Sequence, residues 1–485
     1  MTQQLPHPYS QYKMTIGIEC HVQLATRTKL FSAADNDARE ATPNSKIVPI
    51  DFGLPGMLPV LNRRAVELAV KAAKALNADV ALESRFDRKH YFYPDLPKGY
   101  QISQMYQPII LAGYLDAPLE SGETVRVRIH HAHLEEDAGK LTHKDGYSLV
   151  DLNRAGTPLI EIVSEPDIHS ASAAKAYASE LHKLMIYAGV SRGDLYHGNM
   201  RFDVNISVAK HEAKALGTRA EVKNLNSFKS VEKAAEYEFK RQVDLLESGG
   251  RVVQETRGWD DTKLITISQR SKEDAQDYRY MPDADIPPIR LTSEQVNEIQ
   301  ANVPMLPFEY RNSWKELELD ISVIEALLSN QSYAKLVDEI KQTSTNAHAR
   351  RVAHWFASAI RPEDDVTVQQ LSALKPAGFI ELADMVEADE LSSTAAKEVF
   401  SELLVSDHTA REIAEQRNLI QNSDEDEIAT IVDAVLSDPA SARSIEDIKA
   451  GKDKAIGYLV GQIMKLSAGK ANPALAQKLL RERLR

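Results

Sequence analysis

The sequence has little cysteine and no long apolar run. Its 485 residues include one cysteine, Cys20, which excludes an internal disulfide and a cysteine-rich metal site. No stretch approaches the roughly 18 consecutive apolar residues of a membrane span. Residues 1–13 are polar and have neither the apolar core nor the cleavage site of a signal peptide. These absences predict a cytoplasmic protein with no membrane partner.

Two common nucleotide-binding motifs are also absent. The chain contains neither G-x-x-x-x-G-K-[ST] nor G-x-G-x-x-G, so a P-loop or a Rossmann nucleotide site is not supported. The net charge of -13 argues against non-specific binding of polyanions by the whole surface. A local basic patch remains compatible with that charge.

The composition, 43% hydrophobic and 27% charged, is that of a globular protein too long for a single core. β-Rich, aromatic sequence gives way after about Leu291 to helical periodicity with few aromatics. We therefore predict domains at 1–291, 292–415 and 416–485. Bases outnumber acids from Ser444 onward, which fits either a local polyanion contact or a solvated helical tail.

The segment Thr15–Leu24 is the clearest predicted strand. Apolar residues alternate with Gly17, Glu19, His21 and Gln23, which indicates one dry face and one polar face. Glu19 and His21 then point the same way, about 7 Å apart along the strand. This pattern predicts either a polar site or a solvated sheet face.

Further acids lie on or beside other predicted strands. Glu161 interrupts the apolar run Leu159–Val163, where an unpaired carboxylate is costly. We place a cluster of three acids just after the strand Thr124–His133 and expect it to face water or bind a cation. If the strands share one sheet, the candidate metal ligands are Glu19, His21, Glu135, Glu136, Glu161, Asp203 and Glu221.

A site rich in oxygen with a single imidazole favours Mg²⁺ over zinc, and such cations usually also hold substrate phosphates. The cations available to hold a nucleotide are Lys98, Arg154, Arg201 and Lys223. The aromatic stretch Arg88–Gln101 contains prolines that rule out a helix, so we expect a loop there. Its rings suit stacking on a nucleobase or plugging a core edge equally well.

Several stretches together resemble the GatB family, the B subunits of the tRNA-dependent amidotransferases. They span nearly the whole chain: Ile16–Leu24, Leu54–Asn62, Tyr91–Gln104, His133–Lys140, Ser148–Asp167, Arg219–Phe228, Gln254–Arg257, Asp277–Pro282 and Gly451–Pro473. The resemblance implies an α+β fold, with an antiparallel-sheet cradle domain, a helical domain and a small helical, YqeY-like tail that binds tRNA.

The resemblance also implies an activity. ATP would phosphorylate the misacylated residue of Glu-tRNA(Gln) or Asp-tRNA(Asn), and ammonia would displace the phosphate. Ammonia would arrive from a glutamine-hydrolysing amidase partner, and a small third subunit would join the two into a heterotrimer. The seven candidate ligands match the family's metal positions, and the catalytic residues would be Glu19, His21, Glu136, Glu161 and Glu221.

The sequence departs from the family in two places. Val48-Pro49-Ile50-Asp51 stands where many relatives have Cys-x-x-Cys, so no structural zinc is expected. Phe202 stands where a cysteine is common, which affects packing only. Two rival interpretations are a non-catalytic tRNA-binding scaffold and a standalone carboxylate–amine ligase.

Overall fold

The computed structural model describes residues 8–271, 277–359, 374–421, 425–449, 452–467 and 470–484. The chain divides into two compact units, Met1–Pro307 and Phe308–Arg485. Within the Gly451–Pro473 stretch and the basic C-terminal block, residues 450, 451, 468, 469 and 485 lie outside the described residues. None of the described helices combines the length and apolarity needed to cross a membrane.

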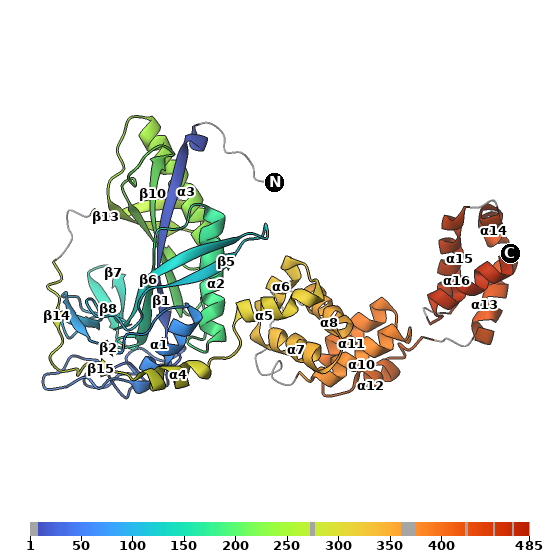
Figure 1. Ribbon diagram of the computed structural model, residues 1–485, viewed down its shortest axis with the longest axis horizontal. Coiled ribbons are helices and arrows are strands. Elements are labelled where there is room, and N and C mark those ends of the chain that lie inside the picture. The colour runs from blue at the N-terminus through green and yellow to red at the C-terminus, as the bar shows by residue number, and fades with distance from the viewer. Residues whose placement is uncertain are drawn as a thin grey trace. The chain divides into compact units, whose positions relative to one another are not determined.

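An eight-stranded sheet is the centre of the first unit (Figure 1). Its strand order is β13-β12-β11-β10-β1-β9-β6-β5, and every neighbouring pair is antiparallel except β11 and β12. The strands are β1 (Tyr12–Gln23), β5 (Gly113–Pro118), β6 (Thr124–Glu136), β9 (Pro158–Ser164), β10 (Met200–Lys210), β11 (Ala220–Leu225), β12 (Glu255–Asp260) and β13 (Ile265–Ser271). This sheet and the helical second unit confirm the predicted α+β class.

The two faces of β1 differ as its sequence predicts. Ile16, Ile18, Cys20 and Val22 are at most 1% exposed, because helices cover that side of the sheet. Helix α1 (Arg63–Ala75) packs on β6, α2 (Ala171–Tyr187) packs on β5, and α3 (Phe228–Glu247) packs on β10 and β11. The other parity leaves Glu19 and His21 on the uncovered polar face.

Polar side chains fix where the three helices begin. Asn62 caps α1, because its side chain accepts a hydrogen bond from the backbone N–H of Arg64 at 2.9 Å. Ser170 and Ser227 accept equivalent bonds at the starts of α2 and α3. The helices therefore begin at defined points and align their apolar faces with the sheet.

The described part of the first unit also contains three smaller sheets. They are β14-β3-β4 (Met281–Pro282, Asp87–His90, Tyr100–Ser103), β15-β2 (Ile289–Arg290, Glu83–Ser84) and β7-β8 (Lys140–Lys144, Tyr147–Asp151). The expected loop over Arg88–Gln101 is wrong at both ends, where His90 pairs with Tyr100. Pro94 and Pro97 fall between the two strands, so they exclude a helix without preventing a hairpin.

Helix α4 (Ser293–Ala301) packs against α1 and completes the first unit. The described part of the second unit is helical and contains α5 (Pro307–Ser313), α6 (Ile321–Leu328), α7 (Gln331–Thr343), α8 (Asn346–Ala359), α10 (Pro376–Glu387), α11 (Ser393–Leu403), α12 (Ala410–Gln416), α13 (Glu425–Ser437), α14 (Ala442–Lys449), α15 (Ile456–Leu466) and α16 (Pro473–Leu484). Helices α13, α15 and α16 share a core that includes Val432, Leu459 and Leu480.

Candidate functional site

Strand pairing brings the predicted acids together on the polar face of the large sheet. In the register of β1 with β10, Glu19 lies opposite Asp203 and His21 lies opposite Arg201. On its other side, β1 places His21 opposite Glu161 of β9. The central strand therefore supplies one residue to each of two groups of ligand-type side chains.

The first group consists of His21, Glu135 and Glu161, whose candidate ligand atoms lie within 4.8 Å of one another. His21 Nε2 is 3.5 Å from Glu135 Oε1 and 3.6 Å from Glu161 Oε2. His133, two residues before Glu135 on β6, reaches the same carboxylates at 3.7 and 3.3 Å. Four residues from three strands thus share one small volume.

Charge compensation holds this first group together. Burial opposes the charged form of His133, but its hydrogen bonds to Glu135 and Glu161 outweigh that effect and raise its pKa to about 9. Burial likewise opposes the charge on Glu161, yet His133 and His21 lower its pKa to about 2. The two shifts therefore favour the protonated form of His133 beside an ionised Glu161.

The second group consists of Glu19, Asp203 and Glu221, also within 4.8 Å of one another. Lys223 Nζ donates to Asp203 at 2.8 Å and lies 2.9 Å from Glu221. Asn205 donates to Glu19 at 3.0 Å, and Thr256 donates to Glu221 at 2.8 Å. These side chains hold three carboxylates in place on neighbouring strands.

The carboxylates of the second group repel one another. Burial, followed by the charges of Glu161, Glu221 and Asp203, raises the pKa of Glu19. Burial opposes the charged form of Lys223, but the surrounding carboxylates, Asp203 first, raise its pKa. A second cation beside Glu19 would relieve the remaining repulsion.

Both groups fit a hard divalent cation. Five of their six donors are carboxylates and one is an imidazole, which is the donor chemistry that suits Mg²⁺. The segment in which relatives carry Cys-x-x-Cys contains one carboxylate, Asp51, which already binds Lys29 at 3.2 Å and Ser32 at 3.2 Å. Residues 48–51 therefore do not fit a thiolate zinc site.

Glu136 does not join either group. Strand β6 continues to Glu136, so the expectation that the acids follow the strand is wrong for Glu135 and Glu136, although Asp137 does follow it. Consecutive side chains on a strand point to opposite faces. The Glu136 carboxylate is 2% exposed, pairs with Lys98 and accepts a 3.0 Å bond from the backbone of Ile102. Its burial excludes the first of the two expected outcomes for the acid cluster, which were exposure to water and binding of a cation.

Two of the predicted cations, Arg154 and Arg201, converge on Asp137, which was not among the predicted ligands. Arg154 donates to the Asp137 carboxylate at 2.8 Å and Arg201 donates at 3.1 Å. Burial opposes the charge on Asp137, but the two guanidinium groups lower its pKa. Thus Lys98, Arg154, Arg201 and Lys223 each bind a carboxylate of this chain.

A cavity of about 670 Å³ lies at the end of the sheet where β1 and β6 finish and β9 and β10 begin. Gln23, Asp137, Arg154 and Arg201 contribute to its wall. Because Arg201 lies opposite His21, the cavity adjoins the first group. Sequence reasoning missed this cavity and His133, although His133 shares the strand parity of Glu135.

Comparisons with known proteins agree over both units. A family model described as the GatB/GatE catalytic domain matches residues 14–297, and a second, described as a GatB domain, matches residues 332–484. Relatives named as the B subunit of aspartyl/glutamyl-tRNA(Asn/Gln) amidotransferase are 43% identical in Persephonella marina and 45% identical in Halorhodospira halophila. Each alignment covers 98% of this chain, with 100% and 99% of the respective relative.

Proposed function

This chain belongs to the GatB/GatE family, and from that premise we propose that it is the B subunit of a tRNA-dependent amidotransferase. It is part of an ATP-dependent ligase that forms a C–N bond, with glutamine as the amido donor. The reaction converts Glu-tRNA(Gln), Asp-tRNA(Asn) or both to the amidated tRNA. The observation that carries this proposal is that strand pairing gathers two clusters of acidic side chains beside one strand, β1.

The first step transfers the γ-phosphoryl group of ATP to the side-chain carboxylate of the misacylated residue. His21, Glu135 and Glu161, together with Glu19, Asp203 and Glu221, would hold Mg²⁺, which offsets charge on phosphoryl oxygens. Asn205 and Thr256 keep Glu19 and Glu221 aligned. His133 lies 3.3 Å from Glu161 and, when protonated, limits repulsion between that carboxylate and a phosphate.

Cationic side chains orient the phosphates. Arg154, Arg201 and Lys223 are bound to carboxylates of the chain, and phosphate oxygens of the substrate would share their remaining N–H donors. Lys98 binds Glu136 on the other parity of β6, so it stabilises the end of that strand and does not orient the phosphates. In the second step, ammonia displaces the phosphate and leaves the amide.

We further propose that the protein works in the cytoplasm, in a heterotrimer with the glutamine-hydrolysing amidase and a small third subunit. Residues 1–291 would carry the catalysis, residues 292–415 would form a helical domain, and residues 416–485 would bind the misacylated tRNA. The excess of bases over acids from Ser444 onward supports the last assignment. We expect no structural zinc, because residues 48–51 contain no cysteine and their one carboxylate, Asp51, already binds Lys29.

The proposal is tested in the purified heterotrimer, with ATP, Mg²⁺, glutamine and each misacylated tRNA in turn. We expect Glu161→Gln and Glu221→Gln to abolish ATP-dependent amidation while leaving tRNA binding intact. Glu120→Gln is the matched control, because the Glu120 side chain is 91% exposed and pairs with Lys175 on the surface.

Full amidation by both variants would show that the two clusters of acidic side chains take no part in the mechanism. It would favour the alternative of a non-catalytic tRNA-binding scaffold. Turnover of a non-tRNA acceptor with free ammonia, in the absence of the partner proteins, would instead favour a standalone ligase.

A further inference from the structure

A buried network of charges lies on the helix-covered side of the sheet, behind the second group. Glu238 of α3 is completely buried, which is costly for a carboxylate unless it is paired. It accepts hydrogen bonds from Arg241 at 2.6 and 2.9 Å, from Gln242 at 2.9 Å and from the Thr266 hydroxyl at 2.9 Å. Because Thr266 belongs to β13, this network joins α3 to the edge strand of the sheet.

Arg257 of β12 is part of the same network. Its Nε donates to the Thr266 hydroxyl at 2.8 Å and lies 3.5 Å from Glu238. Its Nη2 donates to the carbonyl oxygen of Thr266 at 2.9 Å, and its Nη1 donates to Glu255 on the same strand. One guanidinium group therefore binds both strands of the β12–β13 hairpin and reaches the helix behind them.

Thr256, the neighbour of Arg257, points to the opposite face of β12, since consecutive side chains on a strand alternate. On that polar face, the Thr256 hydroxyl donates to Glu221 at 2.8 Å. Glu221 is one of the three carboxylates of the second group. The position of Arg257 on one face of β12 consequently determines the position of a hydroxyl beside the acids on the other face.

The ladder that holds β12 to β11 is short. These strands are parallel, and their three residue pairs begin with Glu221 opposite Thr256. Helix α3 connects the two strands, so no tight turn sets their register. A slip of β12 by one residue would turn Thr256 toward α3 and Arg257 toward the acids.

A bulge in β13 lies at the same place. The pairing of β12 with β13 shifts register between Thr256 and Arg257, and Gln269 is the extra residue of β13. A bulge interrupts the ladder and often redirects a side chain beside an active site. Arg257 is the first paired residue after this bulge, so its contacts with Thr266 and Glu238 support the register where the ladder is irregular.

We propose that Arg257 is a positioning residue for the cation that the second group would hold. It binds β12 to α3 through Thr266 and Glu238, and it thereby keeps the Thr256 hydroxyl on Glu221. A hydrogen bond of this kind orients a ligating carboxylate, and its loss typically weakens metal binding by about tenfold or more. This inference rests on the proposed function, in which the second group binds a divalent cation.

The test measures Mn²⁺ binding to the full chain by titration calorimetry. The background protein carries Glu161→Gln, which removes one of the two carboxylates of the first group, so the tighter binding event reports on the second group. We expect Arg257→Met and Thr256→Val each to raise the Kd of this event roughly tenfold. Thr256→Ser keeps the hydroxyl and should restore most of the affinity.

The direction of the change separates alignment from charge. Removing a cationic side chain should by itself tighten Mn²⁺ binding, because a repulsion is lost. Arg241→Met is the matched control, since Arg241 carries the same charge and binds the same carboxylate, Glu238, but does so from within α3. It leaves the contacts of Arg257 with Thr266 in place, so we expect it not to weaken Mn²⁺ binding.

A double variant tests whether Arg257 acts through Thr256. In the presence of Thr256→Val, Arg257→Met should change Kd by less than about twofold, because the hydrogen bond that it positions is already absent. Thr266→Val is a second probe that keeps the shape of the side chain. It should raise Kd roughly fivefold, because it removes the hydroxyl that joins Arg257 to Glu238.

Three results would overturn this inference and leave the proposed function standing. They are a Kd for Arg257→Met and Thr266→Val equal to that of the background protein, equal weakening by Arg241→Met, or effects of Arg257→Met and Thr256→Val that multiply fully. A background protein without this binding event would contradict both the inference and the metal role that the proposed function assigns to the second group.

Discussion

Removing one partner of the buried ion pair of Lys29 and Asp51 should cost the first unit several kcal/mol. Lys29 is completely buried, its Nζ lies 3.2 Å from Asp51 Oδ2, and it also reaches the carbonyl oxygen of Leu152 at 3.4 Å. The backbone N–H of Val48 donates to the same Asp51 oxygen at 3.0 Å. The pair thereby joins residues 48–51 to the segment that carries Arg154.

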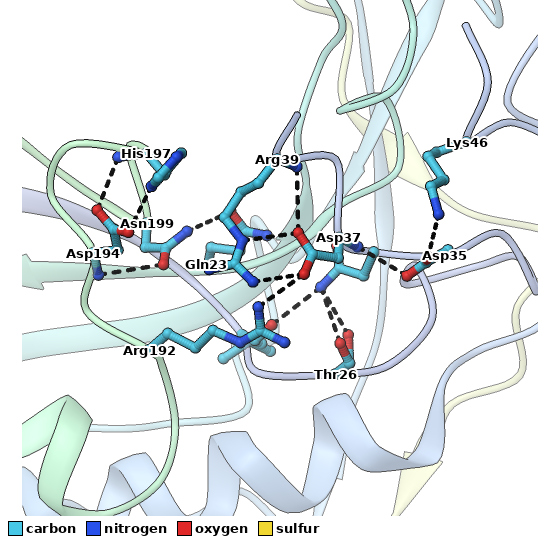
Figure 2. Close-up of polar contacts among 12 residues, drawn as sticks. Gln23, Thr26, Asp35, Asp37, Arg39, Lys46, Arg192, Asp194, His197 and Asn199 are labelled. Carbon is cyan, nitrogen blue, oxygen red and sulfur yellow. Dashed lines mark hydrogen bonds and ion pairs between the residues drawn. The ribbon is translucent and has the colours of Figure 1, made fainter. Parts of the chain in front are cut away.

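Removing one partner leaves the other charge buried. We expect Lys29→Met and Asp51→Asn each to lower the free energy of unfolding by about 3–5 kcal/mol. The double variant removes both charges and should lose much less than the sum, which gives a coupling energy of a few kcal/mol. Lys46→Met breaks the exposed pair with Asp35 shown in Figure 2 and should cost less than about 1 kcal/mol.

The two single variants should differ in their response to pH. Burial lowers the pKa of Lys29, and Asp51 opposes this effect, so the pKa of Lys29 falls further in Asp51→Asn. Below the pKa that lysine has in the unfolded state, the unfolded state then binds more protons than the folded state. The free energy of unfolding therefore increases as the pH rises toward that pKa. The deficit of Asp51→Asn should therefore shrink with rising pH, whereas that of Lys29→Met should not.

Urea unfolding of the full chain measures these free energies. Trp259 lies in the first unit, whereas Trp314 and Trp355 lie in the second, so a background with both of the latter replaced by Phe reports on the first unit. Single variants within 1 kcal/mol of the parent, or single effects that add fully in the double variant, would refute the coupling.

Three further predictions concern the sheet face, and one concerns its surroundings. Burial, then His133 and His130, lowers the pKa of His131 to about 4, so stability should fall as pH drops from 6.5 toward 4, and His131→Gln should remove that loss in urea titrations. The raised pKa of His133 gives the opposite pH dependence of stability: its stabilisation is present below pH 6.5 and is lost as the pH rises toward about 9, and urea titrations over that range should show the loss. Lys223→Met should tighten Mn²⁺ binding roughly tenfold in calorimetry, because the ammonium no longer competes for Asp203 and Glu221; unchanged affinity would place the ion elsewhere. Gly156→Ala should cost about 1–2 kcal/mol of unfolding free energy in urea, because φ is +81° and the new methyl would lie 3.1 Å from Asp51 Oδ1.

The sequence predicted the sheet face because strand alternation is a local signal. In β1 it assigned Glu19 and His21 to one side, and burial of Ile18 and Cys20 confirms the parity. The same rule, applied to β6, separates Glu135 from Glu136 and would have placed His133 in the first group. The prediction failed there because it ended β6 too early.

The cavity wall could not be predicted in this way. Asp37 and Arg39 line the cavity from an irregular segment, and Arg192 lies 153 residues beyond Arg39 in another irregular segment. Neither segment has a repeating pattern, so only the tertiary fold shows that they meet. Arg39 and Arg192, which both bind Asp37, were visible in the sequence only as isolated charges.

Glu19 and His21 are separated by a single residue, yet they serve different neighbours, β10 and β11 for Glu19 and β9 and β6 for His21. The distance between the two clusters is consequently set by the pleat of β1, a central strand that is hydrogen-bonded on both sides. Loop motion cannot widen or narrow it. An insertion of one residue at Cys20 would turn one half of the strand over and dismantle one group while leaving the other, so protein engineering could separate their contributions without replacing any acidic side chain.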